Sequence, residues 1–173
     1  MRRALLLALP LALAGCQTIG ELPTERLGQA TIRLANGLPG GTAQLYASGT
    51  GVTLSIAVAG MTPGTHGIHL HTTGACDAPE FTTAGGHLNP GMKQHGMENP
   101  AGAHLGDLPN LIVGSSGTGT VSATLNGTRE QVLAQLFDAD GTAVVVHANP
   151  DDYKTDPSGN SGTRIACGVL TRT

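Results

Sequence analysis

Tryptophan is absent from this 173-residue chain, which contains only two phenylalanines and two tyrosines. A core without large aromatic rings must be built from Val, Ile, Leu and Ala. The chain also contains 26 glycines, a composition that favours an all-β domain of short strands and tight turns. The length fits one domain better than two.

Basic residues are few as well, with nine Lys and Arg against twelve Asp and Glu and a formal net charge of −3. If the N-terminus is removed with Arg2 and Arg3, seven basic residues remain against the same twelve acidic ones. An acidic chain repels the phosphate backbone, so no nucleic acid is expected as a partner.

The apolar run from Leu5 to Ala14 is too short to span a bilayer, and it follows the charged start Met1-Arg2-Arg3. This order is typical of a secretory signal, so residues 1–15 are expected to be a signal peptide and the protein to be exported. The run ends in Leu13-Ala14-Gly15-Cys16, which resembles the bacterial lipobox. An ordinary signal peptide with an incidental cysteine is the alternative.

The lipobox resemblance implies a lipidated Cys16 that anchors the mature protein to a membrane. Residues 16–28 then form a lipidated tether and residues 29–173 the folded domain. The expected location is the cell envelope, in the periplasm. With Cys16 assigned to lipid, Cys76 and Cys167 remain as a pair that favours a disulfide in an oxidising compartment, against two buried free thiols.

Apolar and polar residues alternate with a period of two along most of the chain, which predicts antiparallel strands joined by tight turns. The expected strands are residues 29–35, 42–47, 52–58, 64–71, 111–113, 119–125, 143–147 and 163–170. Thr128 followed by Gln131 predicts a capping box and a short helical turn through about Gln135. We therefore expect an all-β fold, an antiparallel Greek-key sandwich or flattened barrel of about eight strands with two long loops.

The seven histidines fall in three places. They are His66, His69 and His71 on one strand, His87, His95 and His104 in the first long loop, and His147 at a strand end. His69 and His71 share one strand face because side chains alternate there. Imidazole pairs suit copper, zinc, iron and nickel, whereas the alternative is the polar face of an ordinary strand. Metal binding would also order the long loop, which carries Asp107.

This arrangement resembles the copper/zinc superoxide dismutase family over nearly the whole mature chain. The resemblance is carried by Gly64-x-His66-Gly67-x-His69-x-His71, Ala84-Gly85-Gly86-His87-x-Asn89-Pro90, Lys93-x-His95-Gly96, His104-x-Gly106-Asp107-Leu108, Val146-His147, Pro150-Asp151-Asp152 and Gly162-x-Arg164-x-Ala166-Cys167-Gly168. It implies an eight-stranded Greek-key barrel. The implied activity is disproportionation of superoxide to dioxygen and hydrogen peroxide.

The resemblance also implies one copper and one zinc per subunit. Copper is expected on His69, His71, His87 and His147, and zinc on His87, His95, His104 and Asp107. His87 would bridge the two metals and supply a proton to the reaction. A redox metal suits the all-imidazole set, whereas three imidazoles and one carboxylate suit a closed tetrahedral zinc site.

Four other positions take roles from the same resemblance. Arg164 matches the arginine that docks the superoxide anion beside copper, against the alternative of a solvated charge. Asp151 matches the carboxylate that hydrogen-bonds one histidine of each metal, with Asp152 or a turn signal as its rivals. His66 matches a histidine that ties loops together without binding metal. Lys154 and Lys93 are candidates for steering the substrate, or are plain surface lysines.

Two other functions compete with a dismutase. One is a non-catalytic copper or zinc buffer or chaperone, which the retained His147, His87 and Arg164 disfavour. The other is a structural lipoprotein in which zinc only fastens the loop, and this leaves the copper ligands unexplained. The sequence leaves open whether the chain is a monomer or a homodimer.

Overall fold

The computed structural model describes residues 25–173 of the chain. The expected signal peptide, Cys16 and most of the expected tether lie outside these described residues. Within them, no helix is long and apolar enough to cross a bilayer.

Short strands make up most of the regular structure in the described chain. The strands are β1 (Arg26–Leu34), β2 (Pro39–Ser48), β3 (Gly51–Val58), β4 (Gly64–His66), β5 (Ile68–His71), β6 (Leu111–Val113), β7 (Gly119–Leu125), β8 (Ala143–His147), β9 (Arg164–Val169) and β10 (Thr171–Arg172). The helical segments are η1 (Thr82–Ala84) and α1 (Arg129–Leu136). Thr128 caps α1 through the expected capping box with Gln131.

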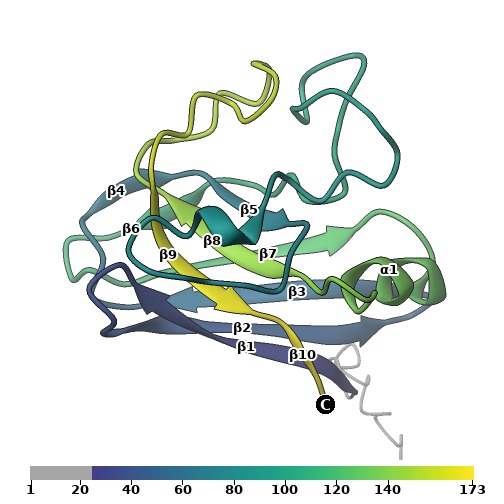
Figure 1. Cartoon of the computed structure of the whole chain (residues 1–173), viewed down its shortest axis with the longest axis horizontal. Helices are drawn as coiled ribbons and strands as arrows, with labels where there is room; N and C mark the ends of the chain where they lie inside the picture. Colours follow the sequence, from purple (N-terminus) through teal and green to yellow (C-terminus); the bar gives the residue numbers. More distant parts are fainter. Residues whose placement is uncertain (1–24) are drawn as a thin grey trace, which may run out of the picture.

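The strands form one antiparallel sheet that curls into a flattened barrel (Figure 1). The strand order is β4-β6-β7-β3-β2-β1-β9-β8-β5, with β10 paired to β1. β4 and β5 lie at opposite ends of this order, although only Gly67 separates them in the sequence. A Cβ atom at Gly67 would lie 2.6 Å from Ser161 Oγ, so a glycine is required where the chain passes from one edge of the sheet to the other.

The observed architecture confirms the all-β Greek-key expectation and changes its details. The histidine-rich stretch, expected as one strand, is divided at Gly67 into β4 and β5. β1 begins at Arg26, three residues before the expected start of the domain, and the two-residue β10 was not predicted. The expected irregular loops connect β5 to β6 and β8 to β9, and both project beyond the same end of the barrel (Figure 1).

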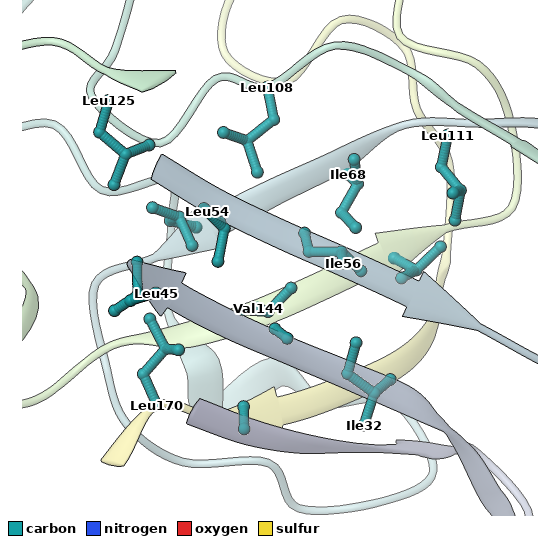
Figure 2. Packing of buried hydrophobic residues seen from close by; sticks show 14 of the residues in the cluster. Ile32, Leu45, Leu54, Ile56, Ile68, Leu108, Leu111, Leu125, Val144 and Leu170 are labelled. Atoms are coloured by element: carbon teal, nitrogen blue, oxygen red, sulfur yellow. The ribbon is translucent and has the colours of Figure 1, made fainter. Parts of the chain in front are cut away.

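The barrel interior is filled by aliphatic side chains from both sides of the flattened sheet (Figure 2). Ile32, Leu54 and Ile56 expose 1% or less of their surface. Each such side chain contributes about 1.5 to 3 kcal/mol by leaving water. No aromatic ring is among the fully buried members of this cluster, as the composition predicts. Phe81 packs instead in a second, smaller cluster with Cys167.

Candidate metal centre

The two long loops return to the barrel beside β5, where they place their functional side chains. His87 and Asp107 form isolated backbone bridges opposite His71 and His69, respectively. The loop passes close to β5 at Gly106, where a Cβ atom would lie 2.4 Å from Leu70 O. Local backbone pairing therefore brings residues distant in sequence to the histidines of β5.

Four imidazoles converge at this point, and we call them the four-histidine set. Its members are His69, His71, His87 and His147. One nitrogen from each lies within 4.8 Å of the others. These nitrogens, Nδ1 of the first and Nε2 of the other three, are buried and have no hydrogen-bond partner among the described residues. Buried polar atoms normally find a partner, so an all-nitrogen set without one fits a metal ion.

The second nitrogen of three of these rings faces a fixed acceptor. His71 Nδ1 donates to Gly85 O over 2.9 Å, and His147 Nδ1 donates to Gly162 O over 3.2 Å. His69 Nε2 donates to Asp151 Oδ2 over 2.7 Å. A ring that donates from one nitrogen presents the lone pair of the other, so these contacts set the tautomers required for metal binding.

A second group of ligand atoms surrounds one carboxylate oxygen, and we call it the carboxylate set. Its members are His87, His95, His104 and Asp107. The Nδ1 atoms of the three rings lie 3.1, 3.0 and 3.2 Å from Asp107 Oδ1. Ligands about 2.0 Å from a tetrahedral zinc ion are separated by about 3.3 Å, so this group fits zinc.

His69 also lies near the carboxylate set, since its ligand atom is within 4.8 Å of those of His87, His95 and Asp107. Its chemistry separates it from that set. Nε2 is occupied by Asp151, and the unpartnered Nδ1 belongs to the four-histidine set. His104 fits the carboxylate set better, because its Nε2 faces Lys93 O over 3.1 Å while Nδ1 faces Asp107.

Burial determines the charge of the metal-free four-histidine set. Burial lowers the pKa of His71 to about 2, of His147 to about 3 and of His87 to about 4, and it also lowers the pKa of His69. These rings are neutral at pH 7, as metal binding requires. Burial also acts to lower the pKa of His95, but hydrogen bonds with Asp107 and Asp151 outweigh it and raise that pKa to about 9. The position between His95 and its carboxylates therefore favours a cation, either a proton or a metal.

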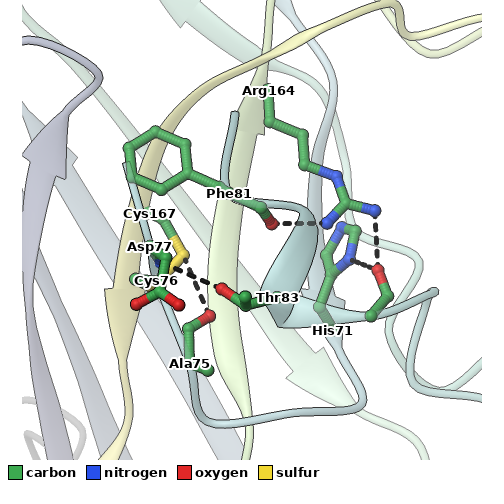
Figure 3. Close-up of a disulfide and its surroundings, with 9 residues drawn as sticks. His71, Ala75, Cys76, Asp77, Phe81, Thr83, Arg164 and Cys167 are labelled. Carbon is green, nitrogen blue, oxygen red and sulfur yellow. Dashed lines mark hydrogen bonds between the residues drawn. A yellow bond between two sulfur atoms is a disulfide. The ribbon is translucent and has the colours of Figure 1, made fainter. Parts of the chain in front are cut away.

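Arg164, at the start of β9, is held beside the four-histidine set by two backbone carbonyls (Figure 3). Nη1 donates to Phe81 O and Nη2 to Gly85 O, each over 2.6 Å. Gly85 O also accepts from His71, so one carbonyl connects the guanidinium to the set. Arg164 lines an open pocket of about 470 Å³, together with Glu80, Thr82 and Thr163.

The expected disulfide is present between Cys76 and Cys167 (Figure 3). It fixes the start of the segment that carries Phe81 and Gly85 to β9, three residues beyond Arg164. The disulfide and the arginine therefore hold the same segment from two sides.

Asp151, rather than Asp152, lies between the two sets. Its Oδ2 accepts from His69, and its Oδ1 accepts from His95 Nε2 over 3.0 Å. Asp152 is exposed and instead stabilises its own loop by accepting from the amides of Lys154 and Thr155. His66 lies outside both sets, with its ring nitrogens at 2.8 and 2.9 Å from the backbone carbonyls of His147 and Thr62.

The two candidate steering lysines do not line the pocket at Arg164. Lys154 forms an exposed ion pair with Glu98 at 2.9 Å, and Lys93 lines a separate hollow beside His104. The acidic Glu80 at the pocket was not singled out from the sequence, since a lone acidic residue in a loop carries no motif. Asn110 and Tyr153, which form hydrogen bonds with Asp151, were not singled out either, because neither belongs to a motif.

The fold is an antiparallel β-barrel, and its site contains two neighbouring groups of side chains that could each hold a metal ion. Comparison with known proteins specifies the family. The pattern of the copper/zinc superoxide dismutase family matches residues 40–170. The chain is 41% identical to superoxide dismutase [Cu-Zn] 1 of Aquifex aeolicus over 75% of this chain and 79% of the relative. It is 38% identical to the Caulobacter vibrioides superoxide dismutase [Cu-Zn] over 82% of this chain and 83% of the relative.

Solved structures agree with the sequence relatives. A superoxide dismutase-like protein from Bacillus subtilis has a TM-score of 0.76 and 37% identity, with coverage of 83% of this chain and 97% of that one. The Cu/Zn superoxide dismutase from Brucella abortus has a TM-score of 0.64 and 25% identity, with coverage of 82% of this chain and 97% of that one. The chain belongs to the copper/zinc superoxide dismutase family, whose members are oxidoreductases that use copper and zinc.

Proposed function

We propose that the four-histidine set binds copper, that the carboxylate set binds zinc, and that His87 bridges the two metals. The unpartnered nitrogens of the four-histidine set carry this proposal, because four buried lone pairs without a donor are costly unless a cation binds them. The donor types support the division of metals: imidazole alone suits copper, and three imidazoles with one carboxylate suit zinc.

Bound copper supplies one-electron oxidation of one superoxide and one-electron reduction of a second. The overall reaction consumes two superoxide anions and two protons and yields dioxygen and hydrogen peroxide. Arg164 presents a fixed positive charge at the pocket, where it attracts and orients the small anion. His87 Nε2 belongs to the four-histidine set, and when its lone pair is not bound to copper it is the atom that we assign to hold one of the two protons.

We further propose that the protein acts outside the cytoplasm, where it protects the cell envelope from superoxide. The proposal rests on the signal-like residues 1–15, the lipobox-like Cys16 and the disulfide. Disulfides persist in oxidising compartments such as the periplasm. Export of the full-length protein in a bacterial host, followed by labelling with a radioactive fatty acid, tests the anchor: Cys16→Ala should abolish labelling and release the protein from the membrane.

Superoxide disproportionation by the purified domain, loaded with copper and zinc, tests the catalytic proposal. The wild-type protein should disproportionate superoxide rapidly, whereas His147→Ala should lose copper and activity while zinc remains bound. His66→Asn is the matched control, since His66 is the histidine outside both sets, and it should keep both metals. A fully loaded wild-type protein without activity would favour a metal buffer or chaperone instead.

A further inference from the structure

Tyr153 lies in the loop between β8 and β9, two residues beyond Asp151, and its backbone has a φ of 62°. Residues other than glycine rarely adopt this left-handed conformation unless their surroundings hold them there. Three hydrogen bonds from different parts of Tyr153 provide that hold.

Each of these hydrogen bonds connects Tyr153 to a different segment. Its amide donates to Asp151 Oδ1 over 2.7 Å, and its carbonyl accepts from the amide of Glu98 over 3.1 Å. Its hydroxyl accepts from the amide of Asn110 over 2.6 Å. Tyr153 therefore joins its own loop to the middle and to the end of the loop that carries the carboxylate set.

Asn110 closes the arrangement from the other side. Its side-chain Nδ2 donates to Asp151 O over 2.9 Å, and its Oδ1 accepts from the Asp151 amide over 2.8 Å. Asp151 is thus held at its backbone by Asn110 and at its carboxylate by Tyr153. The hydroxyl of Tyr153 completes the ring of contacts by fixing the backbone of Asn110.

We propose that Tyr153 is a positioning residue that aligns the Asp151 carboxylate between the two metal sites. Asp151 contacts His69 of the four-histidine set and His95 of the carboxylate set, at 2.7 and 3.0 Å. Hydrogen bonds to the distal nitrogen of a metal-bound histidine fix its orientation and tune its basicity. A shift of Asp151 therefore reaches copper and zinc together. The inference rests on the proposed ligand assignment.

The variant Tyr153→Phe removes the hydroxyl and leaves the ring and the backbone contacts in place. Tyr46→Phe is the matched control, because it removes the hydroxyl of the other tyrosine, which lies on β2 and donates to the Gln44 side chain. In the copper- and zinc-loaded protein, release of zinc to a chelator should be about fivefold faster in Tyr153→Phe, the effect expected from one lost hydrogen bond. Its copper electron paramagnetic resonance spectrum should also change, while Tyr46→Phe matches the wild type in both.

An Asp151→Asn background separates positioning from general stability. If Tyr153 acts through Asp151, adding Tyr153→Phe to Asp151→Asn should change the zinc release rate and the spectrum little further, because coupled residues are not additive. Fully additive effects, or an unchanged copper spectrum in Tyr153→Phe, would overturn the role of Tyr153. The ligand assignment would still be supported if the copper spectrum of the loaded wild-type protein shows nitrogen ligands. A loaded wild-type protein whose copper spectrum shows no nitrogen ligands would overturn the ligand assignment and this inference with it.

Discussion

Removing the disulfide with the double variant Cys76→Ala/Cys167→Ala should lower both stability and turnover. The two cysteines are 91 residues apart in sequence. Closing a loop of this size lowers the entropy of the unfolded chain by the equivalent of about 4 to 5 kcal/mol. For a domain of this length, that loss corresponds to a melting temperature roughly 8 to 20 °C lower.

The effect on turnover follows from the segment beyond Cys76, which contributes both carbonyls that hold Arg164. Without the disulfide this segment has one attachment fewer, and the guanidinium loses part of its fixed orientation. Loss equivalent to one hydrogen bond to a charged group, at least about 1.5 kcal/mol, lowers kcat/KM about tenfold.

Urea denaturation and stopped-flow superoxide decay, measured on proteins of equal copper and zinc content, test both effects. Equal metal content is needed because bound metals also stabilise the folded state. A stability loss below about 1 kcal/mol would refute the loop-closure reasoning. Unchanged kcat/KM would refute the link from the disulfide to Arg164.

Three further perturbations test anion docking, the tight packing at Gly67 and the burial of the histidines. Arg164→Ala should lower kcat/KM about 10- to 100-fold at unchanged metal content, since a hydrogen-bonded charge contributes about 1.5 to 3 kcal/mol; equal turnover by stopped flow would contradict anion docking. Gly67→Ala should cost about 1 to 3 kcal/mol in urea denaturation, because its Cβ would lie 2.6 Å from Ser161 Oγ, whereas Gly91→Ala, with only a 3.5 Å neighbour, is the neutral control. The metal-free protein should lose stability as the pH falls from 6.5 towards 5. Folding lowers the pKa values of His71, His87 and His147 to about 2, 4 and 3, so these histidines take up protons first in the unfolded state. Each of them adds a slope of about 1.4 kcal/mol per pH unit. Metal-loaded protein should show a slope at least as steep, because bound ligand histidines are also neutral in the folded state. A metal-free protein whose stability in urea denaturation does not fall over this pH range would contradict this reading.

Features set by short-range pattern could be predicted from the sequence. The period of two in β3 and β7 is visible in their alternating residues, and the same period places His69 and His71 on one face. The capping box at Thr128 is likewise local, and the structure confirms it. The disulfide followed from the number of cysteines once Cys16 was assigned to lipid.

Features set by contacts between distant segments could not be predicted in this way. The division of the histidine-rich stretch at Gly67 depends on Ser161, which is distant in sequence. Lys154 is neutralised by Glu98 across two loops, so its availability for steering could not be judged from its own neighbourhood. The contact of Tyr153 with Asn110 spans 43 residues and follows no motif.

Anomalous X-ray scattering at the copper and zinc edges, from crystals of the metal-loaded protein, tests the assignment of each metal to its ligands. We expect a copper peak bound by the unpartnered nitrogens of the four-histidine set and a zinc peak bound by the carboxylate set. The His87 ring should lie between the two peaks, with one nitrogen bound to each metal. Two peaks that do not share His87, or one metal occupying the place assigned to the other, would contradict it.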